Sequence, residues 1–195
     1  MKEIKILHLF PRLLSLYGEY GNVAMLKSTL EEKGCAVTVC ECEDGNADYS
    51  AYDFIYVGSG TEDNLMVALQ RLMPHAEKVK ESIDSGKVWL ATGNAMALFG
   101  KTLTRAEELP AIGAFDYAAA IDDSKRFLGD VLTAKEPATL GFINTSCIFK
   151  GISSNTSMNF APMIFRFSSG ELIPSNAEKN LSRASTPTTL SPRHS

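Results

Sequence analysis

A sharp turn between a strand and a helix is the part of the sequence best suited to present a reactive group. The apolar run 88–91 predicts a strand, and residues 95–100 predict the start of a helix. The corner between them holds Thr92, Gly93 and Asn94. Strand-to-helix turns of this kind expose a nucleophile in many hydrolytic enzymes. This corner has the form of such a turn, yet its tip carries neither Cys nor Ser.

Thr92 is the one hydroxyl at the corner, and two roles are open to it. A Thr hydroxyl becomes nucleophilic only beside a base, and the sequence offers no evident candidate for that base. A Thr before a helix more often serves as the N-cap, with its oxygen accepting a bond from a first-turn N–H group. The sequence therefore favours Thr92 as an N-cap.

Two further loops are expected beside this corner, namely residues 11–22 and the Gly-rich segment 58–64. Both follow apolar strands, and ligands of parallel α/β sheets bind at the carboxyl ends of the strands. Backbone N–H groups in such loops can bind an anion, although glycine also serves simply to let a chain turn tightly. Glu62 is the least secure member of the predicted pocket, because an acid in a first helical turn is favourable without any ligand. The predicted pocket residues are Tyr17, Gly60, Glu62, Thr92 and Asn94.

Metal and cofactor motifs are not evident in the sequence. Cys40 and Cys42 share one face of a predicted strand, but two thiols with no His nearby make a poor zinc site. Small buried hydrophobic groups are the simpler interpretation of the four cysteines. No Walker motif and no complete G-x-G-x-x-G fingerprint occurs, so we expect neither a metal nor a cofactor.

Strands alternate with helices through the first hundred residues. Apolar runs predict strands over 4–10, 36–42, 54–57 and 88–91, with helices over 21–34 and 65–85, the latter broken near Pro74. This order predicts an α/β fold of flavodoxin-like type, in which a parallel sheet is flanked by helices. The residues expected to be buried are Leu26, Leu30, Phe54, Ile55, Val57, Leu90 and Leu98.

The chain changes character after Gly100. Residues 112–122, 126–134 and 138–149 predict strands joined by turns, an antiparallel extension of the same domain. We expect one domain over 1–152 and an atypical C-terminal tail over 153–195, rich in Ser, Thr and Pro. A disordered tail and a frameshifted one both explain the abrupt loss of hydrophobic pattern, and the tail beyond Ser175 should be unpacked.

Composition narrows the possible functions. The 195 residues are 45% hydrophobic and 22% charged, with a formal net charge of −4 and no Lys/Arg run, which argues against nucleic-acid binding. No apolar run approaches the roughly 18 residues of a membrane span. Charges interrupt the first ten residues, unlike a signal peptide, so the expected location is cytoplasmic.

Taken in order, the loops resemble a known family. The segments LYGEYGN, YDFIYVGSGTEDN, SGKVWLATGNAMALFGK and LGFINTSCIFKG are similar to four motifs of the CobB/CobQ-like class I glutamine amidotransferases. The family's counterparts are Leu-Tyr-Gly-Asp-x-Gly-Asn, a strand with Gly-Gly-Gly-Gln-Asp, an elbow with Cys-Gly-Gly-Tyr-Gln, and Gly-Phe-Glu-Asn-His. The nearest likeness is to the glutaminase subunit of lipid II isoglutaminyl synthase. The resemblance covers about 150 residues and implies a class I amidotransferase-like fold.

The departures from the family fall on its catalytic residues. The resemblance places the nucleophilic Cys at Gly93, where no covalent attack on a glutamine amide is possible. His8, His75 and His194 all lie outside the family's late His motif, and Thr145 takes the His position of the Gly-Phe-Glu-Asn-His segment. Backbone donors for an oxyanion, near Gly60 and at Asn94, do not depend on side-chain identity and are expected to remain.

Two functions follow from these observations. The resemblance implies a catalytically inactive glutamine amidotransferase-like protein that acts as the partner of a Mur-ligase-like ATP-dependent subunit, with glutamine as a possible ligand. The alternative is a non-catalytic module that binds a small anion or carboxylate in the loops 58–64 and 92–94.

Overall fold

The computed structural model describes residues 2–132, 140–151, 158–159 and 164–165. Four parallel strands form the main sheet in the order β2-β1-β3-β4, which confirms the predicted α/β class. Their bounds are β1 Lys2–Leu9, β2 Cys35–Cys42, β3 Phe54–Val57 and β4 Val88–Ala91. Because all four strands run the same way, their carboxyl ends and the loops that follow share one edge of the sheet.

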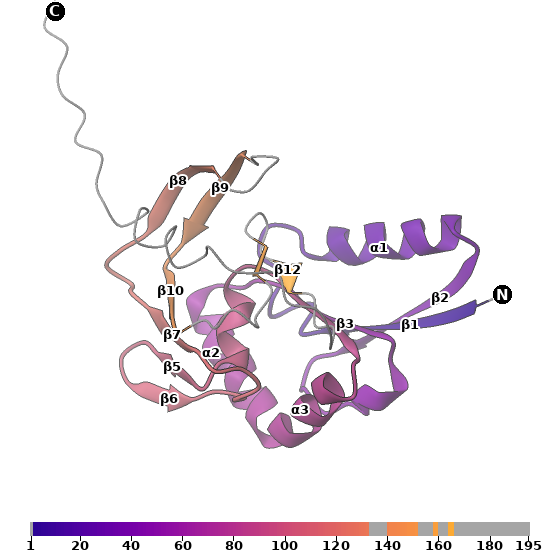
Figure 1. Ribbon diagram of the computed structural model, residues 1–195, viewed down its shortest axis with the longest axis horizontal. Coiled ribbons are helices and arrows are strands. Elements are labelled where there is room, and N and C mark those ends of the chain that lie inside the picture. Colours follow the sequence, from indigo (N-terminus) through magenta and orange to yellow (C-terminus); the bar gives the residue numbers. More distant parts are fainter. Residues whose placement is uncertain (1, 133–139, 152–157, 160–163, 166–195) are drawn as a thin grey trace, which may run out of the picture.

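Helices cover both faces of this sheet (Figure 1). Helix α1 (Tyr20–Glu32) lies on one face, and α2 (Glu62–Leu72) and α3 (Ala76–Asp84) lie on the other, with short 3₁₀ turns at η1 (Tyr49–Ala51) and η2 (Met73–His75). Thr61 caps α2 by accepting a bond from the Asn64 N–H at 3.3 Å. Pro74 lies in η2, so the helical break predicted at this proline is confirmed.

The core is divided unequally between the two faces. On the α2 and α3 side, Trp89 packs between Tyr49 and Phe99, and all three are almost fully buried. The α1 side has a smaller buried cluster of Ile6, Val23 and Tyr56.

The burial predictions were therefore right on one face only. Ile55, Val57 and Leu98 are buried as predicted. Four other residues are only partly buried, because α1 alone covers this side of the sheet in the described part of the chain. They are Leu26 and Leu30 on α1 itself, and Phe54 and Leu90 on the strands.

The second half begins with a 3₁₀ helix, η3 (Gly93–Phe99), where a longer helix was expected. A second sheet follows in the order β10-β7-β5-β6, from β5 Thr102–Thr104, β6 Glu108–Pro110, β7 Ala118–Ile121 and β10 Cys147–Lys150. Its pairs are antiparallel except β5 with β7. This mixed sheet is close to the predicted antiparallel extension.

Two short pairs complete the described structure. Strands β8 (Phe127–Leu132) and β9 (Leu140–Thr145) form a separate antiparallel ribbon beside the second sheet (Figure 1). Strands β11 (Met158–Asn159) and β12 (Ile164–Phe165) pair beyond the predicted boundary at residue 152. The predicted unpacked tail after Ser175 lies outside the described residues.

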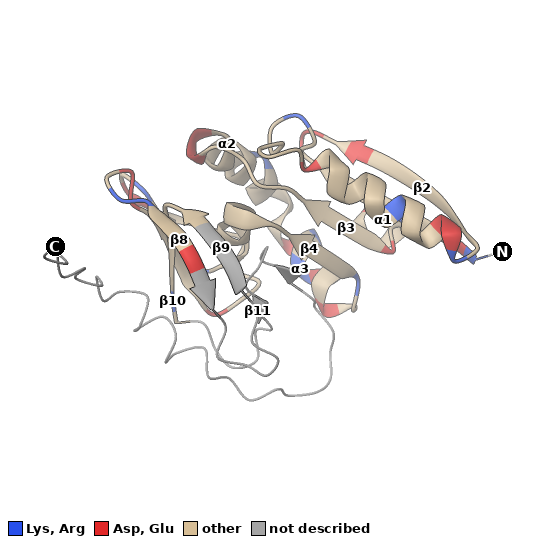
Figure 2. Ribbon diagram, turned by 90° about the horizontal axis from the view of Figure 1, so that it is seen from above, with Lys and Arg blue, Asp and Glu red and all other residues tan. Residues whose placement is uncertain are grey.

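Acidic and basic residues are interspersed along the chain, and both signs occur at the turn that precedes β8 (Figure 2). Among the helices of the described residues, none has the length and apolarity to cross a bilayer.

Candidate functional site

The loops after β1, β3 and β4 meet at the carboxyl edge of the main sheet. The Leu16 N–H donates to the Ser59 carbonyl at 2.9 Å, and the Thr92 N–H donates to the Val57 carbonyl at 3.0 Å. Residues 58–64 and 92–95 thus lie at the same end of the sheet, as a shared site requires.

Close packing explains two glycines of the loop after β3. A Cβ on Gly58 would lie 2.5 Å from the Leu14 carbonyl oxygen, and a Cβ on Gly60 would lie 2.5 Å from Leu14 Cδ2. At Gly58 the neighbour is backbone and leaves no room for a side chain, whereas at Gly60 it is the end of the flexible Leu14 side chain. Gly58 is therefore required because the loop after β1 packs directly onto it, whereas the turn itself does not demand glycine.

Gly93 has the backbone geometry of a nucleophile elbow. Its φ of +54° lies in the left-handed region, directly after β4 and at the start of η3. A Cβ built on Gly93 would lie 2.7 Å from Ser59 Cβ and 3.2 Å from Ser59 Oγ. The elbow therefore keeps its shape, but Ser59 occupies the space that a side chain at position 93 would need.

A buried carboxylate, Glu19, lies beneath the elbow and was missed by the sequence analysis. Glu19 is 5% exposed and accepts hydrogen bonds from the hydroxyls of Tyr56, Ser59 and Thr92. The Asn22 side-chain amide donates a fourth bond at 3.0 Å. Burial and the bond to Glu19 raise the pKa of Tyr56 well above its usual value, so this phenol remains a donor.

The Glu19 cluster joins the three loops. Its Oε2 accepts from the Tyr56 and Thr92 hydroxyls and from the Asn22 amide, and its Oε1 accepts from the Ser59 hydroxyl. Residues that are far apart in the sequence therefore share one buried acceptor. We conclude that Glu19 organises the elbow.

Thr92 has a different bond from the predicted one. It occupies the N-cap position of η3, but its side chain makes no cap bond and donates to Glu19 at 2.9 Å. The expectation of a side-chain cap was wrong because the buried carboxylate is the stronger acceptor. The expectation that no base lies near Thr92 was also wrong, although this hydroxyl is only 6% exposed.

Asn94 closes the elbow from the other side. Its Oδ1 accepts a bond from the Gly60 N–H at 3.1 Å, and its Nδ2 donates to the Gly60 carbonyl at 2.7 Å. The Gly60 N–H was predicted to be a donor for an oxyanion. In the structure this N–H already has a partner, and that partner is a carboxamide of the chain itself.

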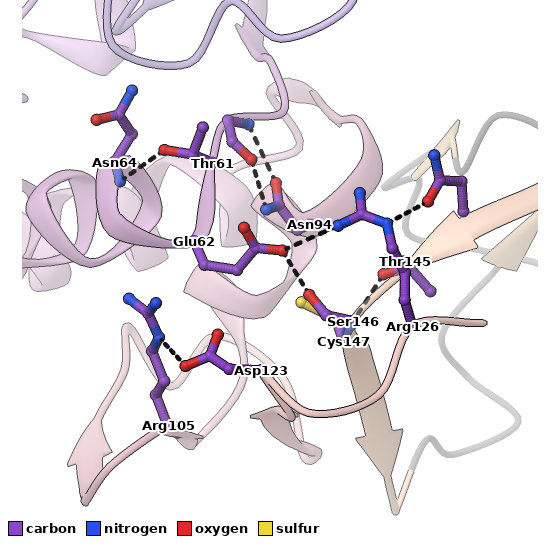
Figure 3. A network of polar contacts seen from close by, with 12 residues as sticks. Thr61, Glu62, Asn64, Asn94, Arg105, Asp123, Arg126, Thr145, Ser146 and Cys147 are labelled. Carbon is purple, nitrogen blue, oxygen red and sulfur yellow. Dashed lines mark hydrogen bonds and ion pairs between the residues drawn. The ribbon is translucent and has the colours of Figure 1, made fainter. Parts of the chain in front are cut away.

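An open, charged pocket of about 200 Å³ lies at the N-terminus of α2 (Figure 3). Ser146 donates to Glu62 at 2.5 Å, and the Arg126 guanidinium lies 4.0 Å from the same carboxylate. The bond from Ser146, supported by the nearby arginines Arg126 and Arg105, lowers the pKa of Glu62. The pocket is lined by Glu62, Asp123, Ser124, Lys125, Arg126 and Ser146.

Tyr17 lies at the rim of this region and is 72% exposed. Its hydroxyl accepts two long bonds, from Arg126 at 3.5 Å and from the Asn144 amide at 3.4 Å. The predicted site residues thus separate into three groups: Gly60, Thr92 and Asn94 at the closed elbow, Glu62 in the open pocket, and Tyr17 between that pocket and solvent.

Two buried side chains lie close to these clusters, His8 near Glu19 and Cys147 near Glu62. His8 is buried against Tyr56, where desolvation lowers its pKa, and its Nε2 has no hydrogen-bond partner within the described structure. Burial raises the pKa of Cys147 to about 12. The described ranges contain no group of three or more His, Cys, Asp or Glu side chains placed to bind a metal ion.

Two curated proteins are similar to this chain in sequence. The lipid II isoglutaminyl synthase (glutamine-hydrolyzing) subunit GatD of Streptococcus pneumoniae is 27% identical over 133 residues, which are 66% of this chain and 51% of that protein. The same subunit of Staphylococcus aureus is 25% identical over 146 residues, 73% of this chain and 59% of that protein. The chain thus spans somewhat more than half the length of these relatives. No family profile matches it. The two similarities support the relation to this glutaminase subunit that the motifs indicated.

Proposed function

We propose that this chain is a glutamine amidotransferase-like protein that does not hydrolyse glutamine. The observation that carries the proposal is Gly93: the elbow has its left-handed backbone, no side chain, and no room for one beside Ser59. A class I glutaminase needs a thiolate at this point to attack the amide carbon, and a base to return a proton to the leaving ammonia.

The hydroxyls near the elbow are poor replacements for that thiol. Ser59 and Thr92 are 7% and 6% exposed, and both donate to Glu19. Because both side chains are buried and both hydroxyl protons point at this carboxylate, neither oxygen is open to an incoming amide. The proposal therefore assigns no nucleophile to this cluster.

The relatives are named as subunits of a synthase, and this suggests the role of the chain. We assign it a structural or regulatory role as the partner of a Mur-ligase-like ATP-dependent subunit that amidates a cell-wall precursor. In this role the domain contributes its surface, and ammonia comes from elsewhere.

Ammonia release from glutamine tests the proposal. The wild-type chain should release none above background, alone or with an ATP-dependent partner, while the Streptococcus pneumoniae relative serves as positive control. Sustained release would overturn the proposal, and replacement of the four cysteines would then show whether one of them or a different residue is the nucleophile.

A second candidate function is the binding of a small zwitterion or carboxylate, favoured by the open pocket at α2. Two acidic and two basic residues line this pocket of about 200 Å³: Glu62, Asp123, Lys125 and Arg126. A small molecule with both a positive and a negative group could therefore pair each of them with a residue of opposite charge. Calorimetry with L-glutamine and with glutarate tests this candidate. Arg126→Gln should remove binding, and Arg12→Gln, which changes an exposed arginine outside this pocket, should not.

A further inference from the structure

The contact between Gly93 and Ser59 is a mutual exclusion of side chains. The nearest atom to a Cβ at position 93 is Ser59 Cβ, at 2.7 Å, a separation that two carbon atoms essentially never adopt without bonding. The Ser59 hydroxyl oxygen is farther away, at 3.2 Å. The obstacle is therefore the carbon skeleton of residue 59 more than its hydroxyl group.

Ser59 cannot easily leave this position. Its hydroxyl donates to the buried Glu19, and its carbonyl accepts the Leu16 N–H at 2.9 Å. Gly58 and Gly60 on either side pack closely against Leu14. A side chain introduced at position 93 thus meets a residue that is fixed through both its side chain and its backbone.

We propose that Ser59 determines the identity of residue 93: with serine at 59 the elbow accepts only glycine, and with glycine at 59 it accepts alanine or cysteine. This inference rests on the proposed function, since it gives the reason why the elbow has no nucleophile. In the Gly-Gly-Gly-Gln-Asp motif that segment 58–64 resembles, the second residue is glycine where this chain has Ser59. The same resemblance places the nucleophilic Cys at Gly93, so it pairs glycine at the first position with a side chain at the second.

Unfolding in urea tests the exclusion through alanine, which adds only the crowded Cβ. Gly93→Ala should lower the midpoint strongly, and adding Ser59→Gly should recover much of that loss even though Ser59→Gly alone is destabilising. Ser59→Ala is the matched control, because it removes the hydroxyl but keeps the Cβ that crowds position 93. Combined with Gly93→Ala, it should give no recovery.

A second control separates crowding from backbone strain. Gly86 has a φ of +84° and open space around a built Cβ, so Gly86→Ala carries the left-handed strain without the clash. Gly86→Ala should therefore lower the stability less than Gly93→Ala does. Its effect should add to that of Ser59→Gly in the double variant, as expected for positions without contact. If the losses of Ser59→Gly and Gly93→Ala also simply add, the proposal is wrong.

Alkylation with iodoacetamide then examines the reopened elbow. In the Ser59→Gly, Gly93→Cys double variant, peptide mapping should find a modified residue 93, against a background set by the four native thiols in wild type. If Gly93→Ala does not fold, a folded Ser59→Gly, Gly93→Ala variant supports the proposal, and failure of both to fold overturns it. None of these measurements uses glutamine, so ammonia release by the wild type would defeat the proposed function without deciding this one.

Discussion

Two glutamates at the same edge of the sheet each accept a hydrogen bond from a serine, but their surroundings differ. Glu19 is 5% exposed and has four donors, all from the chain. The Glu62 side chain is 25% exposed, accepts a bond from Ser146, and faces Arg126 at 4.0 Å across an open pocket. The first carboxylate is enclosed by donors of the chain, whereas the second borders an open pocket.

This difference teaches where function can remain when a catalytic residue is replaced. At the elbow, the Ser59 and Thr92 hydroxyls and the Gly60 N–H are bonded within the chain, so these groups stabilise the fold. At the pocket, Glu62 and Arg126 lie 4.0 Å apart and border open space. The following changes test that division.

Glu19→Ala should cause the largest loss, about 3 kcal/mol of unfolding free energy. Three buried hydroxyls and one amide would lose their shared acceptor, and each buried unsatisfied group is costly. Urea unfolding at pH 7 measures the loss. Glu62→Ala provides the comparison and should cost clearly less, and equal losses at the two positions would remove the distinction between the closed and open sites.

Asn94→Ala should cost about 1–2 kcal/mol, because the Gly60 N–H and carbonyl would both lose a partner. Asn64→Ala is a matched control, since its side-chain amide makes a single bond, to the Leu13 carbonyl. Thermal unfolding of both variants should show the larger shift for Asn94. A larger shift for Asn64→Ala would mean that Asn94 does not close the elbow.

Ser146→Ala should cost about 1 kcal/mol at pH 7 and almost nothing in acid. The bond from Ser146 lowers the pKa of Glu62 in the folded state, so its stabilisation is present above the unfolded value of about 4.3. It is lost as the pH falls through the lower folded value. Paired urea curves of the variant and wild type at several pH values measure this change. A pH-independent difference would show that Glu62 is not the group involved.

Tyr17→Phe should have the smallest effect, a stability indistinguishable from that of the wild type. The Tyr17 side chain is exposed, and its two hydrogen bonds are long, at 3.4 and 3.5 Å. If the pocket binds glutarate, the same variant also tests whether the Tyr17 hydroxyl contributes to the affinity for glutarate. A large thermal shift would instead place Tyr17 inside the folded core of the site.

The main sheet could be predicted from sequence because its signals are local. Each strand is an apolar run bounded by a turn, and the helices carry their own end signals in Thr61 and Pro74. Burial under α1 was overestimated because an apolar pattern does not reveal how many elements will cover a face. The short η3 was likewise taken for a longer helix.

The elbow could be predicted only in part. Its position and the absence of a nucleophile follow from the residues around Gly93, but the filling of its space by Ser59 depends on a contact between separate loops. Glu19 was missed because an acid in a loop gives no sign that hydroxyls will surround it. The bond between Asn94 and Gly60 also joins residues 34 positions apart, beyond the reach of any local pattern.

The hydrogen bonds that Glu19 accepts have a consequence for the order of folding. Its three hydroxyl donors stand 37, 40 and 73 residues away along the chain, so no local segment can supply them. The carboxylate would lose its water before gaining its partners unless β3 and β4 have already assembled beside β1. Its stabilisation is therefore gained late, on the native side of the folding barrier. Removing Glu19 should accelerate unfolding much more than it slows refolding, so this carboxylate sets how long the assembled domain lasts.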